Sequence, residues 1–209
     1  MFTAASGPDS KAFTRRDAQE DAMAEPGPPA GAKILKAKVC LVGDEAVGKT
    51  SLVHRFVHGV FDETYIRTLG AVPTKRALDL VASEGRPVHV DLTILDIMGR
   101  RTFLELFKDA YFHGAQGILA VVDVTHRATL ERIGGWVTGV RSVAGDVPIV
   151  LVANKADLAE RSEYGAAEVK AVARSLGGES FVTSAKTGDD VEAAFHRLAT
   201  LVADRLLRV

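Results

Sequence analysis

Apolar runs alternate with stretches of helical apolar spacing along most of the chain. Short apolar runs, which are typical of strands, occupy residues 36–42, 117–124 and 147–154. The second and third runs are almost unbroken, as expected for parallel strands that are buried on both faces. Two further runs within residues 75–96 lie on either side of Ser83–Arg86. Apolar and polar residues partly alternate in both runs, which predicts a β-hairpin.

The segments between these runs carry apolar residues at helical spacing. They predict helices over residues 51–59, 126–144, 163–177 and 188–207. Strands that alternate with helices predict an α/β fold, in which helices cover both faces of a mostly parallel sheet. Ligands bind such sheets at the carboxyl ends of the strands, so we expect the functional motifs to follow the strands.

The first 33 residues differ in composition from the rest of the chain. They are rich in Ala, Gly, Pro and charged residues and end in EPGPPAGA, which disfavours regular structure. We interpret residues 1–33 as a flexible N-terminal tail and residues 34–209 as a single compact domain.

Composition narrows the function classes and the compartment. The chain has 209 residues and a formal net charge of −1, so no overall field would steer it to nucleic acid. Cys40 is the single cysteine, and we expect it to be a core residue in a reducing compartment. No apolar stretch is long enough to span a bilayer, and neither end carries a secretory or lipidation signal. These observations predict a cytoplasmic protein without a direct lipid anchor.

The stretch GDEAVGKTS follows the first apolar run and matches the phosphate-loop pattern Gly43-x-x-x-x-Gly48-Lys49-Thr50. The glycines let successive backbone N–H groups converge on an anion, and the following helix adds its N-terminal dipole. We expect Lys49 to bridge the β- and γ-phosphates of a nucleotide and the Thr50 hydroxyl to bind Mg²⁺. The candidate nucleotide-binding residues of this loop are Glu45, Ala46, Val47, Gly48, Lys49, Thr50 and Ser51.

Two later motifs, VANKAD and FVTSAKTG, provide candidate contacts to a guanine base. The carboxylate of Asp157 can accept hydrogen bonds from both the N1–H and the exocyclic amine of guanine, a pattern that adenine does not offer. The Ala185 amide is placed to meet guanine O6, and two lysine stems can lie along the ring faces. The candidate base-binding residues are Asn154, Lys155, Asp157, Ser184, Ala185 and Lys186.

With these motifs in order, the chain resembles the Ras superfamily of small GTPases, and the Rab branch most closely. The Rab-like features are YIRTLGA (65–71), AYFHGAQGILAVVDVT (110–125), Trp136 and FVTSAK. The resemblance implies a phosphate-loop NTPase fold, a three-layer sandwich with a six-stranded sheet. It implies a switch that binds GTP and GDP with Mg²⁺ and hydrolyses GTP. It also implies that Phe61 packs on the guanine and that Thr68 binds Mg²⁺ and the γ-phosphate.

The resemblance also implies partners, namely effector, exchange-factor and activating proteins that bind the two switch regions of a monomer. Nucleic acid is not among them. Rab proteins usually present a Phe, Trp and Tyr trio across the switches. The matching positions here are Pro73, Leu95 and Tyr111, so we do not expect standard Rab effectors to bind.

The stretch LDIMGRR fits the D-x-x-G pattern but departs from the family after it. We expect Asp96 to hold Mg²⁺ through a bound water and the Gly99 amide to meet the γ-phosphate. The family usually has Gln next, whose amide both accepts and donates and so aligns the attacking water. Arg100 only donates and stays charged, so we expect slow intrinsic hydrolysis. Alternatively, Arg100 supplies positive charge to the transition state. The candidate catalytic residues are Lys49, Thr68, Gly99 and Arg100.

Glu45 and Met98 are two further departures from the family. Glu45 stands where the phosphate loop usually has a small residue, and a triphosphate would repel its carboxylate. We hypothesise that Glu45 pairs with Arg100, which would neutralise this charge and close the γ-phosphate pocket. Met98 replaces a small residue ahead of the switch glycine, and we expect its bulk to limit rearrangement.

Two other functions stay open on the sequence alone. One is a hydrolysis-deficient scaffold that stays bound to GTP and acts only through partner binding. The other is an ATP-using phosphotransferase, which Asn154, Lys155 and Asp157 argue against. The six histidines show no metal-ligand spacing, and we interpret Trp136 as a helix-packing residue.

Overall fold

The computed structural model describes residues 28–62, 68–83 and 85–208. The predicted tail lies almost entirely outside the described residues, as do the first three residues of YIRTLGA. The elements are, in chain order, β1 (Lys33–Val42), α1 (Lys49–His58), β2 (Ala71–Val81), β3 (Pro87–Ile97), α2 (Arg101–Phe112), β4 (Gly117–Asp123), α3 (Arg127–Ala144), β5 (Ile149–Asn154), the 3₁₀ helix η1 (Ala156–Arg161), α4 (Ala166–Ser175), β6 (Glu179–Val182) and α5 (Val191–Arg208).

The strands form one six-stranded sheet in the order β2-β3-β1-β4-β5-β6. Strand β1 lies between β3 and β4 and is parallel to both, and β4, β5 and β6 continue in parallel. Strand β2 is antiparallel to β3, as the predicted hairpin requires. The predicted mostly parallel α/β sheet is therefore confirmed.

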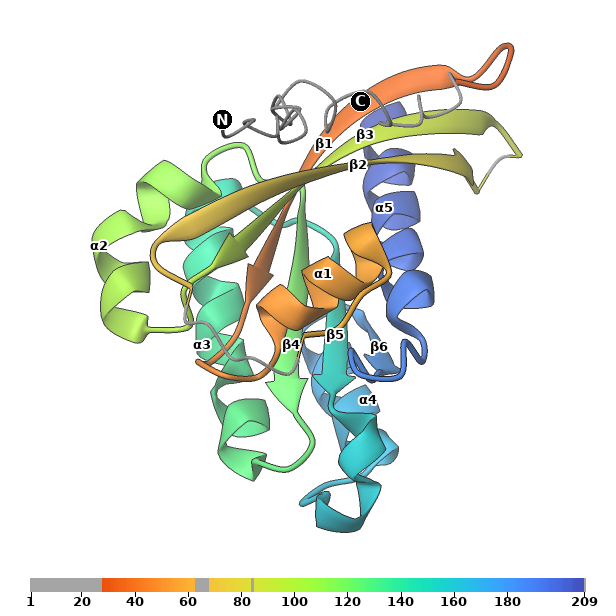
Figure 1. Ribbon diagram of the computed structural model, residues 1–209. Helices are drawn as coiled ribbons and strands as arrows, with labels where there is room; N and C mark the ends of the chain where they lie inside the picture. Colours follow the sequence, from red (N-terminus) through yellow and green to blue (C-terminus); the bar gives the residue numbers. More distant parts are fainter. Residues whose placement is uncertain (1–27, 63–67, 84, 209) are drawn as a thin grey trace, which may run out of the picture.

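Helices cover both faces of the sheet (Figure 1). Helices α1 and α5 pack on one face, where the rings of Phe56 and Phe195 stack with centroids 4.1 Å apart. Helices α2, α3 and α4 contribute Phe112, Trp136 and Val169 to the core on the other face. The result is the three-layer sandwich that the resemblance implied.

Most predicted elements are present, with ends that differ by a few residues. The apolar pattern did not predict α2 or the short strand β6. Helix α2 carries apolar residues at helical spacing, so a usable signal was present, and it leaves Leu106 and Phe107 exposed. Within the described ranges, no helix combines the length and apolar character needed to cross a membrane.

Candidate nucleotide-binding site

A cavity of about 400 Å³ opens at the carboxyl ends of the central strands. Most of the predicted nucleotide residues line it, from the phosphate loop through Phe61 and Thr68 to Asn154 and Ala185. Four predicted residues are not among its lining residues: Val47, Asp96 and Ser184 are buried, and Arg100 lies at the start of α2. The cavity also includes residues that the motifs did not indicate, namely His54, Asp62, Ile97, Met98 and Leu158.

Two glycines of the phosphate loop have backbones that a side chain would not fit. Gly43 has φ +143° and faces the Val121 carbonyl, and Gly48 has φ +97° and faces the Asn154 amide. A Cβ at either position would clash with these groups. The glycines therefore let the loop pass closely over β4 and β5 before α1 begins.

Lys49 is buried beneath the loop, with 6% of its surface exposed. Its ammonium donates hydrogen bonds to the carbonyls of Gly43 (2.9 Å) and Asp44 (2.8 Å). Burial lowers the pKa of Lys49 to about 8, against the opposing effect of the nearby carboxylates of Asp96, Asp44 and Glu45. A nucleotide phosphate in the cavity would favour the charged ammonium in the same way.

The three predicted metal-binding residues meet beside the cavity, which Thr50 and Thr68 line. The Thr50 hydroxyl donates to Asp96 Oδ2 (2.5 Å), and the Thr68 hydroxyl lies 2.8 Å from Thr50 Oγ1 and 3.3 Å from the same carboxylate oxygen. The other oxygen, Asp96 Oδ1, is buried and has no partner in the described part of the chain. This set of hard oxygen donors fits Mg²⁺, which prefers one or two protein carboxylates together with phosphates. Burial raises the pKa of Asp96, with hydrogen bonds from Thr50 and Thr68 opposing it.

Asn154 connects the phosphate loop to the predicted guanine loop. Its amide donates to the Val47 carbonyl (3.0 Å), and its carbonyl oxygen accepts from the Ala185 N–H (3.1 Å) and the Thr183 hydroxyl (3.3 Å). The Ala185 amide, expected at guanine O6, thus also has a partner within the protein. Because Asn154 is buried, these hydrogen bonds fix the positions of the two loops relative to each other.

Asp157 lies at the cavity with its carboxylate held by Ser184, whose hydroxyl donates to Asp157 Oδ1 (2.6 Å). Lys155 is held by Asp123, with 2.6 Å between Lys155 Nζ and Asp123 Oδ2. Burial acts to raise the pKa of Asp123, but bonds from Lys155 and Thr125 outweigh it, so the pKa is lowered. The sequence reasoning missed Asp123, although its position at the end of β4 was a usable signal.

The phosphate loop is also attached to α3, which the motifs did not indicate. Asp44 Oδ2 accepts from Arg132 Nε (2.7 Å), and Asp44 Oδ1 accepts from the indole N–H of Trp136 (2.8 Å). Trp136 is buried, as predicted for a packing residue, but it also contacts the loop that is expected to hold the phosphates. Helix α3 therefore helps to position this loop.

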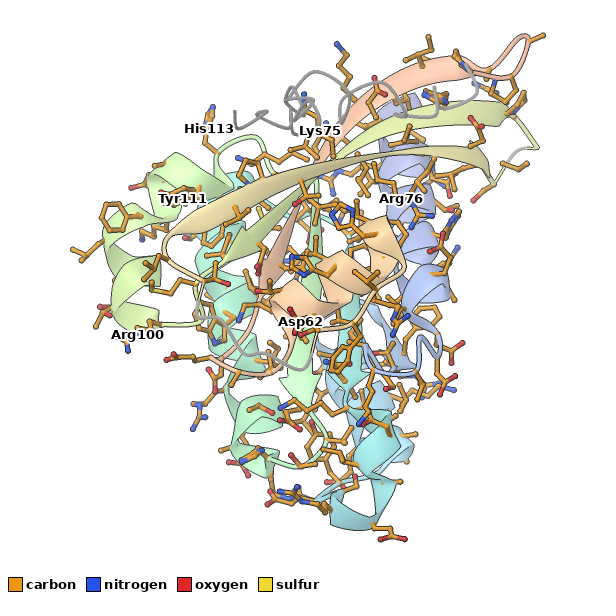
Figure 2. The ribbon with its side chains drawn as sticks, viewed as in Figure 1. Asp62, Lys75, Arg76, Arg100, Tyr111 and His113 are labelled. Carbon is orange, nitrogen blue, oxygen red and sulfur yellow. The ribbon has the colours of Figure 1, made fainter. Side chains whose placement is uncertain are left out.

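The segment that follows β3 from Met98 and leads into α2, which we call switch II, begins directly against the phosphate loop. Gly99 packs on the peptide between Asp44 and Glu45 so closely that a Cβ would clash with it. Arg100 follows, with its Nε 3.3 Å from Glu45 Oε2. The hypothesised contact between Glu45 and Arg100 is therefore present in the structure. Arg100 lies at the beginning of α2 and Tyr111 near its end (Figure 2).

Fold and site together define a phosphate-loop nucleotide-binding protein. A model of the Ras family matches residues 38–204. The chain is 32% identical over 177 residues to the Ras-related protein Rab-4 of Dictyostelium discoideum, covering 84% of this chain and 83% of the relative. It is 36% identical over 184 residues to the Ras-related protein RAB1BV of Beta vulgaris, covering 86% and 83%. It is 33% identical over 172 residues to the GTP-binding nuclear protein GSP1 of Encephalitozoon cuniculi, covering 82% and 78%.

The chain therefore belongs to the Ras family and is close to the Rab proteins. It is a molecular switch that binds GTP and GDP with Mg²⁺ and hydrolyses GTP. Like other members, it interacts with regulatory and effector proteins.

The variant Asp157→Asn tests the base contact. An amide cannot accept the two guanine N–H groups as a carboxylate does, so GDP affinity should fall about 100-fold. Xanthosine diphosphate should bind better than GDP, because its extra carbonyl accepts from the amide. Competition titrations measure both affinities. Asp189→Asn is the matched control. Asp189 is an exposed carboxylate of the neighbouring loop and accepts a hydrogen bond from the Thr187 hydroxyl. Unchanged guanine preference in Asp157→Asn would contradict the assignment.

A double-mutant cycle tests the attachment of the loop to α3. Asp44→Ala leaves the buried Trp136 N–H without its acceptor, which should lower the free energy of unfolding by about 1–3 kcal/mol. Trp136→Phe should then destabilise the Asp44→Ala protein less than the unmodified protein. Urea unfolding of the GDP-bound variants gives all four values. Strictly additive effects would exclude the coupling.

Proposed function

We propose that this GTPase is a switch with slow intrinsic hydrolysis, in which a Glu45–Arg100 ion pair fastens switch II to the phosphate loop. The observation that carries the proposal is the contact of Arg100 Nε with Glu45 Oε2 at 3.3 Å. A guanidinium occupies the position where the family usually has a water-orienting amide. Because it donates but does not accept, it does not align a water for attack as Gln does.

The other catalytic roles in the proposal follow from position. Hydrolysis is an in-line attack of water on the γ-phosphorus, catalysed mainly by positioning and electrostatics. The Lys49 ammonium stabilises negative charge on the β- and γ-phosphates, and the Gly99 amide donates to the γ-phosphate. Thr68 fastens the segment of residues 61–70, which we call switch I, over the γ-phosphate. Bound Mg²⁺ supplies charge neutralisation, and Thr50, Thr68 and Asp96 would hold it, the last through water.

The proposal extends to how partners recognise the protein. Of the three positions that match the Rab trio, Pro73 and Leu95 are paired across β2 and β3, and Leu95 is almost fully buried. On the neighbouring helix α2, Leu106 and Phe107 are exposed. We propose that effectors bind an apolar surface that includes Pro73, Leu106 and Phe107, in place of the usual Phe, Trp and Tyr trio.

Arg100→Gln should accelerate hydrolysis. Restoring a group that both accepts and donates should raise the single-turnover rate of GTP cleavage at least about tenfold, or ~1.4 kcal/mol of barrier. The matched control is Arg127→Gln, because Arg127 forms a similarly exposed ion pair with Glu168 away from the cavity. A slower Arg100→Gln protein would instead favour Arg100 as a source of transition-state charge. No cleavage by either protein would favour the scaffold function.

A second cycle measures the proposed ion pair itself. Glu45→Gln, Arg100→Gln and the double variant are compared by the release rate of fluorescent GDP. An exposed pair contributes about 0.2–1 kcal/mol, so each single change should accelerate release by up to roughly fivefold. The double variant should be no faster than the faster single variant. Rates that multiply independently would refute the pairing.

A further inference from the structure

Arg55 lies on α1 with its guanidinium turned toward the loop that contains Ser184–Lys186. Its Nε donates to the Ala185 carbonyl (2.9 Å) and its Nη2 to the Lys186 carbonyl (2.5 Å). Its Nη1 donates to the Gly59 carbonyl (2.8 Å), just after α1 ends. One side chain thus joins the predicted guanine loop to the end of the first helix, across 131 positions of sequence.

The Ala185 residue is consequently held at both of its polar backbone groups. Its N–H donates to Asn154, which is itself bonded to the phosphate loop, and its carbonyl accepts from Arg55. Ala185 is 3% exposed, so these bonds lie largely out of water. Hydrogen bonds from a charged donor are shorter and stronger than neutral ones, and they hold the loop more firmly than solvent would.

We propose that Arg55 is a positioning residue for guanine recognition. It keeps the Ala185 N–H at the wall of the cavity, where guanine O6 would share this donor with Asn154 Oδ1. Through Gly59 it also places the start of the segment that leads to Phe61, which lines the same cavity. This inference rests on the proposed base-binding role of Ala185.

The planar guanidinium is required because three carbonyls must be bonded at once. A lysine ammonium is a point charge on a flexible stem and does not offer the same fixed fork of donors. Arg55→Lys should therefore be intermediate between the unmodified protein and Arg55→Met, which keeps much of the stem but has no donor.

The experiment compares the release of GDP from the unmodified protein, from Arg55→Met and from a control variant. Arg55→Met should release fluorescent GDP about tenfold faster, because the guanine loop loses two charge-assisted bonds and Gly59 loses a third. The matched control is Arg197→Met, because Arg197 likewise bonds a strand residue, Glu179, through Nε (2.8 Å) and Nη2 (2.5 Å), but outside the cavity. Arg197→Met should stay within about twofold of the unmodified protein.

A second ligand separates positioning from general stabilisation. The 5′-diphosphate of 2-aminopurine riboside lacks O6 and the N1–H, so it loses the contact with the Ala185 amide and one bond to Asp157. The Arg55 effect is therefore read by comparing variants with the same ligand. The affinity of this analogue, measured by competition, should change less than about twofold in Arg55→Met, while that of GDP falls about tenfold. Equal losses for both ligands, or GDP release within about twofold of the unmodified rate, would overturn the proposal.

Two further results have definite meanings. If Arg55→Met does not fold, Arg55→Lys is compared with the unmodified protein instead. Its affinity for GDP should fall by less than about tenfold, and its affinity for the analogue should not change. If the unmodified protein binds GDP and the O6-lacking analogue equally well, the proposed role of Ala185 fails, and the role of Arg55 fails with it.

Discussion

The site depends on one buried cation held by backbone carbonyls. Lys49 lies beneath the phosphate loop and donates to two carbonyls of that loop, with little exposure to water. Burial disfavours its charged form, so the loop must supply compensating oxygens at fixed positions. The glycines that bring the loop close to β4 and β5 make this geometry possible. The contacts from α3 and switch II hold the same short loop from its other sides.

The sequence predicted those features that are encoded locally. The buried strands were recognisable because their apolar runs are nearly unbroken, and the phosphate loop because its residues are consecutive. Helix α2 was missed although Phe103, Phe107 and Tyr111 recur at helical spacing in its sequence. Leu106 and Phe107 on its exposed face belong to the surface that we propose for effectors.

The contacts that position the site were harder to predict, since they join residues far apart in the chain. Trp136 and Asp44 are separated by 92 positions, and their bond depends on how α3 packs against the sheet. Burial of Trp136 was predictable from its helical spacing, whereas the direction of its N–H was not. The pairing of Glu45 with Arg100 was predictable because two departures from the family had opposite charges at neighbouring sites.

The roles proposed for Arg100 and Arg55 lie at opposite ends of the nucleotide, and their contacts belong to different energetic classes. The Arg100–Glu45 pair is partly exposed, with the two side chains 48% and 31% accessible, so salt screens it and partners can replace it. Arg55 bonds carbonyls, one of them belonging to the buried residue Ala185, and its contribution depends on hydrogen-bond geometry more than on ionic strength. A contact that must open in each cycle has to be weak, whereas one that preserves base specificity in both nucleotide states has to persist. The two proposals thus assign an exchangeable contact to the γ-phosphate, where GTP and GDP differ, and a persistent contact to the base, where they do not.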